Sequence, residues 1–309
     1  MKIIFLNKYQ NKVSRGAETF VNELSKRLAI ENEVEVISKI NYMKLLFSNF
    51  DVIVPINGRL QVFLVRLISL IKGAKMIVSG QSGMGLDDRV NLYAFPDVFV
   101  AISSKAKEWA KTINPLVKTV YIPNGVDLNK FNNKGSKIKI YLKPPIILYV
   151  GAIDKQKRVD LAVKAVSKLK KGSLVLVGRG KWEKTIQKLG EKMLPGRFKM
   201  MSFLHRDMPK VYKSADLFTF PTVSWESFGI VLVEAMASGL PVVTNNDQIR
   251  KGIVGQAGEF VDPTDTDLYA DKIEKSLKKD WGDKPRKQAE KFDWDKIAKE
   301  YEALCKSLL

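Results

Sequence analysis

Short apolar runs alternate with amphipathic stretches along most of this chain of 309 residues. In the first half, the runs predict strands at residues 2–6, 34–37, 52–56, 76–79, 98–102 and 119–122. Helices are expected between several of them, at residues 17–29, 60–72 and 105–111. Continuous apolar strands that alternate with amphipathic helices are typical of a parallel sheet covered on both faces. The pattern therefore predicts an α/β, doubly wound architecture of the Rossmann-like kind.

The alternation stops and then starts again near the middle of the chain. A polar stretch at 129–136, followed by Pro144-Pro145, is typical of a linker. After it, strands are expected at residues 146–150, 174–177, 198–202, 217–220, 242–244 and 259–261, and helices at 159–169, 182–189, 229–237 and 268–277. We therefore predict two Rossmann-like domains, residues 1–142 and 143–292, facing across a cleft. A helix at 293–309 is expected to dock back on the first domain.

Composition limits the chemistry open to this chain. One cysteine, Cys305, and one histidine, His205, leave no disulfide framework, no cluster of zinc ligands and no Ser-His-Asp triad. Residues 1–6 read as a strand and not as a signal peptide. The longest apolar stretch, 60–71, is interrupted by Arg66 and falls short of the ~20 residues that cross a bilayer. We expect a cytoplasmic protein, bound at most to the inner face of the membrane.

The net charge of +19 indicates anionic partners. Residues 1–142 carry 21 Lys and Arg against 11 Asp and Glu, and residues 143–309 carry 31 against 22, so the charge is spread over both halves. Without a basic tail or an Arg-rich aromatic motif, we do not expect nucleic-acid binding. A phosphate-bearing ligand or an anionic membrane surface is favoured. Residues 60–72, with basic residues around them, suit an interfacial helix, and a buried helix of a doubly wound domain fits equally.

The segment 226–243 is the most informative stretch for chemistry. It reads E-S-F-G-I-V-L-V-E-A-M-A-S-G-L-P-V-V, which predicts a tight entry at Gly229 and a helix that stops near Gly239. Backbone N–H groups at such a helix start form an anion site that suits a diphosphate. Glu226 and Glu234 could then each bind hydroxyl groups, one set on a sugar and one on a ribose. As alternatives, Glu226 complements the helix dipole and Glu234 is a solvated residue, but the small apolar residues after Glu234 place it on a packed face.

With these residues the chain resembles glycosyltransferase family 4, of the GT-B fold, over nearly its whole length. The family's Glu-x7-Glu motif is Glu226 with Glu234, inside the pattern E-x-F-G-x4-E-A-M-A-x-G-x-P-V-V. The resemblance implies a retaining enzyme that moves a sugar from a UDP- or GDP-sugar. It also implies that Glu226 contacts hydroxyls of the donor sugar and that Glu234 holds the ribose. The amides around Phe228, Gly229 and Ile230 would meet the sugar and the phosphates.

Two further segments resemble the family's diphosphate-binding parts. Arg15-Gly16 stands where the family has two glycines, so Gly16 would let the backbone approach a phosphate and Arg15 could donate to it. Lys157 matches the family's diphosphate lysine, but the accompanying arginine is replaced by Ala152. Arg158, or Lys155 beside it, could supply the missing charge. Taken without the family, this basic run is a solvated surface loop.

The remaining family positions are less complete. Gln81 stands where members often place a histidine near the reacting sugar, and a glutamine can hydrogen-bond the acceptor or the donor sugar but cannot act as a base. Its loop, 80–85, reads equally well as a flexible surface loop. The segment 123–127 also matches the family, and we interpret it as a structural turn. We expect His205 either to border the base of the nucleotide or to have a structural role, and we assign it no catalytic role.

The resemblance implies a mechanism that needs no protein base. The acceptor attacks on the face that the diphosphate leaves, and the departing phosphate oxygen takes the acceptor's proton. The protein positions the substrates and stabilises charge through Lys157, the helix-start amides and Arg15. Neither a metal nor another cofactor is expected. The sequence does not specify the sugar, the linkage or the oligomeric state, and the expected acceptor is a glycan or a lipid-linked glycan in cell-envelope or exopolysaccharide synthesis.

Three alternatives compete with this interpretation. A non-catalytic protein that binds sugar nucleotides is supported by Ala152 and Gln81 and opposed by Glu226, Lys157 and Glu234. A phosphorylase or epimerase of the same fold is a second, although no pyridoxal-lysine context is present. A dinucleotide-dependent oxidoreductase is the third, and it lacks Gly-x-Gly-x-x-Gly after the first strand.

Overall fold

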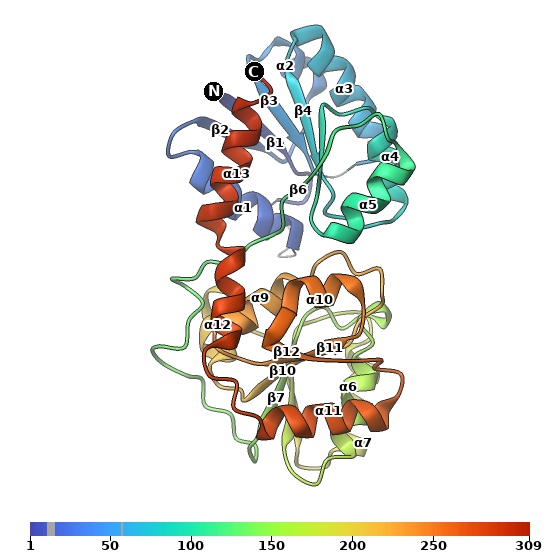
Figure 1. Ribbon diagram of the computed structural model, residues 1–309, viewed down its shortest axis with the longest axis vertical. Coiled ribbons are helices and arrows are strands. Elements are labelled where there is room, and N and C mark those ends of the chain that lie inside the picture. Colours follow the sequence, from blue (N-terminus) through green and yellow to red (C-terminus); the bar gives the residue numbers. More distant parts are fainter. Residues whose placement is uncertain (11–15, 57) are drawn as a thin grey trace. The chain divides into compact units, whose positions relative to one another are not determined.

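The structure is a computed structural model that describes residues 1–10, 16–56 and 58–309 (Figure 1). The chain divides into two compact units. The first unit comprises Met1–Gly125 and Phe292–Leu309, and the second comprises Val126–Lys291. Each unit contains one six-stranded sheet whose strands are all parallel. The expected doubly wound α/β architecture is therefore confirmed in both units.

The first sheet has the strand order β2-β1-β3-β4-β5-β6. Its strands are β1 (Lys2–Leu6), β2 (Glu33–Ile37), β3 (Val52–Pro55), β4 (Lys75–Ser79), β5 (Val98–Ala101) and β6 (Thr119–Tyr121). Its helices are α1 (Gly16–Leu28), α2 (Tyr42–Phe47), α3 (Leu60–Lys72), α4 (Leu86–Tyr93), α5 (Ser104–Ile113) and α13 (Trp294–Lys306). One core cluster joins the sheet to α1 and α13, and the other joins it to α2, α3, α4 and α5. The apolar runs of β1, β3, β4 and β5 are buried on both faces, whereas the edge strands β2 and β6 are partly exposed.

The C-terminal helix α13 packs on α1 in the first unit. Its Trp294 and Tyr301 lie 6.1 and 5.7 Å from the ring of Phe20, measured between ring centroids. Gly125 is required here, because a Cβ at this position would lie 2.7 Å from the indole of Trp294. The end of the chain is thus part of the first core.

The second sheet has the strand order β12-β11-β10-β7-β8-β9. Its strands are β7 (Ile146–Val150), β8 (Ser173–Val177), β9 (Phe198–Met201), β10 (Leu217–Phe220), β11 (Val242–Asn245) and β12 (Gly258–Val261). Its helices are α6 (Val159–Ser167), α7 (Glu183–Met193), α8 (Met208–Tyr212), α9 (Ile230–Ala237), α10 (Gln248–Val254), α11 (Thr266–Lys278) and α12 (Lys284–Ala289). The strand order reverses between β7 and β10. Ligands of open α/β sheets bind at such a switch point, beyond the carboxyl ends of the strands.

Residues 126–142, which the sequence analysis assigns to the first domain, belong to the second unit. The guanidinium of Arg286 on α12 donates to the backbone carbonyls of Leu128 and Phe131 at 3.0 and 2.6 Å. Phe131 is buried as well. A polar composition suggested a free linker, but these contacts fasten the segment to α12.

None of the helices in the described ranges is both long and apolar enough to cross a bilayer.

A buried carboxyl group gives the first unit a predicted pH dependence. Asp88 on α4 is 1% exposed, and burial raises its pKa from 3.8 to about 8. The folded state therefore favours the neutral acid, and this contribution to stability is lost as the pH rises from about 4 to about 8. Asp88→Asn should therefore become more stable than the wild type as the pH rises through this range. Above pH 8 its free energy of unfolding should exceed that of the wild type by about 2–4 kcal/mol. Urea denaturation at a series of pH values measures the difference.

The matched control is Asp87→Asn. This neighbouring carboxylate pairs with Arg59 at 2.6 Å on the surface. A pH profile that is the same for both variants would show that burial of Asp88 is not the cause.

Candidate functional site

The carboxyl ends of β7 and β10 meet at the switch point of the second sheet. The rings of Tyr149 on β7 and Phe220 on β10 stack with their centroids 6.0 Å apart. The hydroxyl of Tyr149 donates to the carbonyl of Ala152 at 2.9 Å and so fixes the start of the loop after β7. The loops that follow these two strands, residues 151–158 and 221–229, carry most of the predicted site residues.

The structure brings Lys157 and Glu226 together, one from each loop. Lys157 ends a short 3₁₀ turn, and its Nζ lies 2.5 Å from Glu226 Oε2. The same Nζ lies 5.7 Å from the ring centroid of Phe220, and the hydroxyl of Thr222 donates to the same carboxylate at 3.4 Å. Both charged side chains are about one-fifth exposed. They form a partly buried, mutually neutralised pair that still reaches solvent.

The side chains of Asn245 and Arg250 bind the main chain of the loop that carries Glu226. Asn245 accepts from the amide of Thr222 at 2.9 Å and donates to its carbonyl at 2.7 Å. The guanidinium of Arg250, which is 0% exposed, donates to the carbonyls of Glu226 and Ser224 at 2.7 and 3.1 Å. These contacts fix the main chain on both sides of the pair.

Arg250 and Asn245 fix the loop of the candidate site, and neither was indicated by the sequence pattern. Arg250 also pairs with Asp247, which accepts from two backbone amides and so caps α10. An aspartate just before a helix is a recognisable helix-start signal, and Asp247 provides it here. The pattern does not reveal that the arginine is fully buried or that it binds another loop.

The start of α9 forms the other side of this site. Gly229 has φ 85°, in the left-handed region that favours glycine, and a Cβ there would lie 3.1 Å from the ring of Phe220. Phe228 before it is 1% exposed. The first N–H groups of a helix have no partner within the helix, so Ile230 begins a natural anion-binding end.

Glu234 is the fifth residue of α9, a little more than one turn from the start of the helix, and it is only 6% exposed. Its Oε2 accepts a hydrogen bond from the hydroxyl of Tyr212 at 2.7 Å. Burial, together with the charge of Glu234, raises the pKa of Tyr212 well above its ordinary value. Tyr212 therefore remains a neutral donor. The carboxylate is fixed by this one strong bond.

His205 lies beside the other oxygen of Glu234. Its Nε2 is 3.5 Å from Oε1, too long for a strong hydrogen bond, and its Nδ1 is 2.9 Å from Nζ of Lys130. Since an ammonium group only donates, Nδ1 accepts and Nε2 carries the ring proton. The histidine therefore turns a donor toward Glu234, which the sequence did not indicate.

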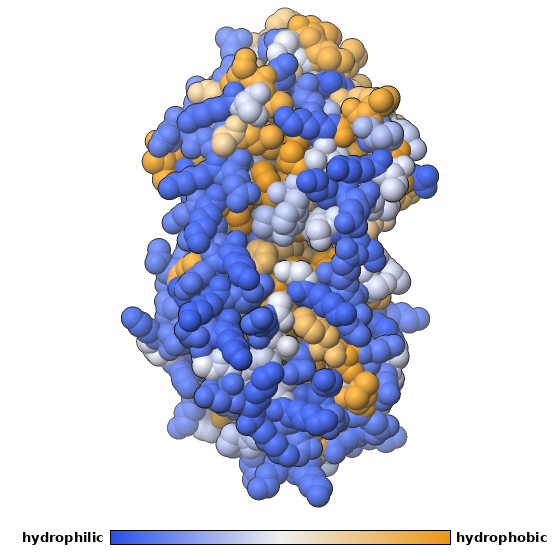
Figure 2. Space-filling view, viewed as in Figure 1, coloured by the Kyte–Doolittle hydropathy of each residue, from blue (hydrophilic) through white to orange (hydrophobic). Residues whose placement is uncertain are grey.

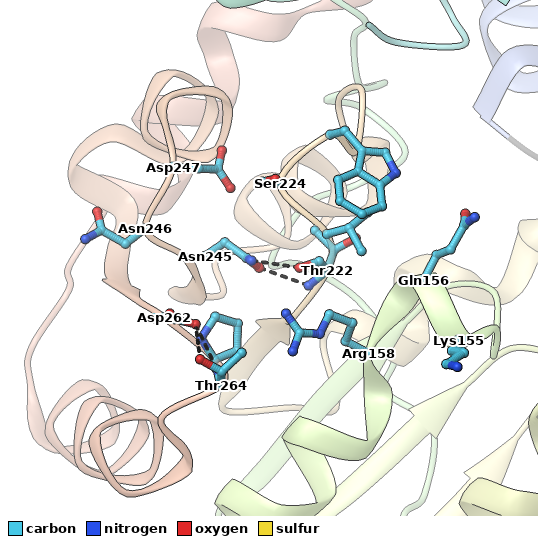
Figure 3. Close-up of a pocket in the computed structure, with 13 residues that line it drawn as sticks. Lys155, Gln156, Arg158, Thr222, Ser224, Asn245, Asn246, Asp247, Asp262 and Thr264 are labelled. Atoms are coloured by element: carbon cyan, nitrogen blue, oxygen red, sulfur yellow. Dashed lines mark hydrogen bonds between the residues drawn. The ribbon is translucent and has the colours of Figure 1, made fainter. Parts of the chain in front are cut away.

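A pocket of about 900 Å³ opens beside the Lys157–Glu226 loops (Figure 3). It is lined from the carboxyl ends of four strands, by residues 155, 156, 158, 222–225, 245–247 and 262–264. Figure 3 shows the Arg158 side chain between Thr222 and Thr264. Arg158 adopts φ 48° at the start of α6. Arg158 and Lys155 are the two cationic side chains of the loop that line the pocket.

The predicted residues of the first unit have separate surroundings. Gly16 is the first residue of α1, and Arg15 lies outside the described residues. The amide of Gln81 exchanges two hydrogen bonds of 3.0 Å with Asn124 and donates to Ser79 at 2.9 Å. Gln81 thereby ties the loop after β4 to the segment that we interpreted as a structural turn.

Potential metal ligands are not clustered in the described part of the chain. Nowhere among residues 1–10, 16–56 and 58–309 do three His, Cys, Asp or Glu side chains lie together as a metal site would require.

Comparison with protein families gives one match, to the family described as "Glycosyl transferases group 1", over residues 130–293, more than half of the chain. Among curated proteins, the sulfoquinovosyl transferase of Arabidopsis thaliana is 28% identical over 55% of this chain and 36% of its own length. An uncharacterized glycosyltransferase of Methanocaldococcus jannaschii is 30% identical over 65% and 57%. The phosphatidyl-myo-inositol mannosyltransferase of Mycolicibacterium smegmatis is 28% identical over 64% and 54%. The matches thus span about one-third to three-fifths of these relatives.

Three solved structures resemble the whole chain. Anabaena HepE in complex with UDP and glucose has a TM-score of 0.81 at 18% identity, over 99% of this chain and 100% of its own. Sucrose-phosphate synthase from Thermosynechococcus elongatus has 0.79 at 18%, over 99% and 98%. The lipopolysaccharide outer core galactosyltransferase WaaB has 0.78 at 16%, over 100% of both chains. At these identities the likeness shows the fold, which is GT-B.

The contacts of Arg250 with the loop and with Asp247 predict a large loss of stability when this residue is substituted. Arg250→Met removes the donors of two loop carbonyls and leaves Asp247 without its cation in the interior. The free energy of unfolding should fall by about 3–5 kcal/mol, measured by urea denaturation. The control Arg179→Met removes an exposed i,i+4 pair with Glu183 and should cost only about 0.5 kcal/mol. Equal losses in the two variants would contradict this prediction.

Proposed function

The chain belongs to the group 1 glycosyl transferases, and from this membership we propose that it is a retaining enzyme of the family 4 type. It would move a sugar from a UDP- or GDP-sugar to a glycan or a lipid-linked acceptor. The observation that carries the proposal is the Lys157–Glu226 pair, which lies at the switch point of the second sheet. The start of α9 leads from this pair to the buried carboxylate of Glu234.

The Lys157–Glu226 pair suits a binding site for an anionic donor. A diphosphate would compete with Glu226 for the ammonium group of Lys157 and would also meet the amides at the start of α9. Glu226 would then be free to accept hydrogen bonds from hydroxyls of the donor sugar. The complex of the similar HepE with UDP and glucose supports a donor of this class.

Glu234 and Arg158 would complete donor binding. Oε2 of Glu234 is occupied by Tyr212, whereas Oε1 lies beyond strong hydrogen-bond range of His205. Oε1 is therefore the oxygen that we assign to a ribose hydroxyl. Arg158 lines the pocket beside the loop and would supply the cation that is missing at Ala152.

In the proposed reaction, the acceptor oxygen bonds to the anomeric carbon as the bond from that carbon to the diphosphate breaks. Attack occurs on the face that the diphosphate leaves, and the acceptor's proton passes to the departing phosphate oxygen. The protein stabilises the charge on the diphosphate through Lys157 and the helix-start amides, without a metal or other cofactor. No protein base is required, so Gln81 in place of a histidine is compatible with turnover.

We also propose that the protein acts in the cytoplasm and binds peripherally to the inner face of the membrane, in the synthesis of a cell-envelope or extracellular glycan. The names of two similar proteins, a phosphatidyl-myo-inositol mannosyltransferase and a lipopolysaccharide galactosyltransferase, support a lipid-linked acceptor. The net charge of +19 suits both a phosphorylated acceptor and an anionic surface. A nucleic-acid partner is not part of the proposal.

The primary test is a donor screen by saturation-transfer NMR on wild type and Glu234→Ala. One nucleotide sugar should bind, and its Kd should rise about tenfold or more in the variant because a ribose hydroxyl loses its acceptor. Glu183→Ala, which removes a surface carboxylate on α7, is the matched control and should bind like wild type. If no nucleotide sugar binds to wild type, the proposed function is wrong.

The second test addresses charge stabilisation by Lys157. With the donor found by the screen, Lys157→Ala should lower the kcat for hydrolysis of that donor by about 10²–10³-fold, because the leaving diphosphate loses its cation. Initial rates are followed by NMR, which also reads the anomeric configuration of the product. Lys164→Ala, on the surface of α6 and paired with Asp160, is the control. A kcat unchanged by Lys157→Ala would remove this lysine from the mechanism.

A further inference from the structure

Helix α3 of the first unit presents a wholly apolar face to solvent. Six of its side chains are 41–81% exposed: Leu60, Phe63, Leu64, Leu67, Leu70 and Ile71. Its opposite face is buried in the core of the sheet through Val62, Val65 and Ile68. A surface helix of a globular protein ordinarily turns polar residues outward, so a helix that is apolar on both faces indicates a second apolar environment.

Helix α2 extends this face. Its Met43 and Phe47 are 64% and 79% exposed, and Nζ of Lys72 on α3 donates to the carbonyl of Leu46 at 3.0 Å. We call these two residues and the six on α3 the α2–α3 patch. Figure 2 shows hydrophobic residues gathered at the top of the view, where Figure 1 places α2 and α3. Single exposed leucines are common, but eight neighbouring large apolar side chains mark an interaction surface.

The chain around the patch is strongly basic. Residues 39–75 contain six Lys and Arg and one acidic residue, Asp51, whose carboxylate accepts from the backbone amide of Lys2. Arg59 and Arg66 pair with Asp87 and Asp97. In the described structure the four lysines of this stretch form no ion pair: Lys39, Lys44, Lys72 and Lys75. An apolar surface with unneutralised lysines beside it complements a layer that is apolar inside and negatively charged outside.

We propose that the α2–α3 patch is a membrane-docking surface that inserts into the interface of an anionic bilayer. With 13 residues α3 is too short to span a bilayer, and its leucines would enter the acyl boundary to about 5–10 Å while the lysines meet the headgroups. A second copy of the chain fits less well. A twofold contact through this patch would bring the same lysines of both copies together. The inference deepens the proposed peripheral role, but it depends on neither a donor nor turnover.

The test measures sedimentation of the full chain with unilamellar vesicles. The protein should bind vesicles of phosphatidylglycerol mixed with phosphatidylcholine, and less strongly as salt is raised. Leu64→Gln/Leu67→Gln should lower the partition coefficient at least about tenfold, because two side chains lose their place in the apolar layer. The matched control, Leu116→Gln/Leu204→Gln, changes two leucines that are 81% and 61% exposed elsewhere and should bind like wild type.

Three results would overturn the proposal. In the first, the wild type binds neither the mixed vesicles nor pure phosphatidylcholine vesicles. In the second, both double variants lose vesicle binding equally. In the third, the wild type does not bind vesicles but forms a dimer by sedimentation velocity that only Leu64→Gln/Leu67→Gln abolishes. Circular dichroism shows whether each variant is folded. Donor binding by NMR distinguishes the two hypotheses. Vesicle binding without any nucleotide-sugar binding would contradict the proposed function and still support the docking surface.

Discussion

The site depends on the buried guanidinium of Arg250. A planar group with several donors can satisfy the carboxylate that caps α10 and two carbonyls of the loop after β10 at the same time. Lysine has no such geometry. The loop that carries Glu226 therefore has a fixed main chain although it has no regular secondary structure. A charged group this deep in a protein is tolerated only when it is fully paired, so the loop and the helix start constrain each other.

This constraint explains how two loops can hold a charged pair at a precise place. Lys157 comes from the loop after β7 and Glu226 from the loop after β10, and the strands beneath them are neighbours only because the strand order reverses there. The ring of Phe220 lies under the ammonium group and limits its access to water. A pair with reduced hydration exchanges one anionic partner for another at little cost. The fold thus fixes the position of a cation at the site that we propose for the donor.

The sequence predicted the periodic parts of the structure and the motif with fixed spacing. All six strands of the first sheet begin and end within one residue of their expected positions. Four of them, β1, β3, β4 and β5, are buried on both faces, and such a strand leaves an uninterrupted apolar run. Glu234 was placed on a packed face by the small residues after it. The short helices α2 and α4 were missed, since neither spans enough residues for a period to show. Arg250, Tyr212 and the histidine beside Glu234 depend on contacts between distant segments, which no local pattern records.

Helix α3 shows where periodicity reaches its limit. An apolar run of this length fits a buried helix and an interfacial helix equally, because the pattern counts apolar residues but not the neighbours available to cover them. The sheet covers only one side of α3, and α2 is too short to cover the rest. Six large apolar side chains then remain partly in water, and complete burial would stabilise each by less than about 1.5–3 kcal/mol, the value for a fully exposed side chain. Because a chain of net charge +19 repels its own copies, an anionic surface is the partner that can recover this energy without bringing like charges together.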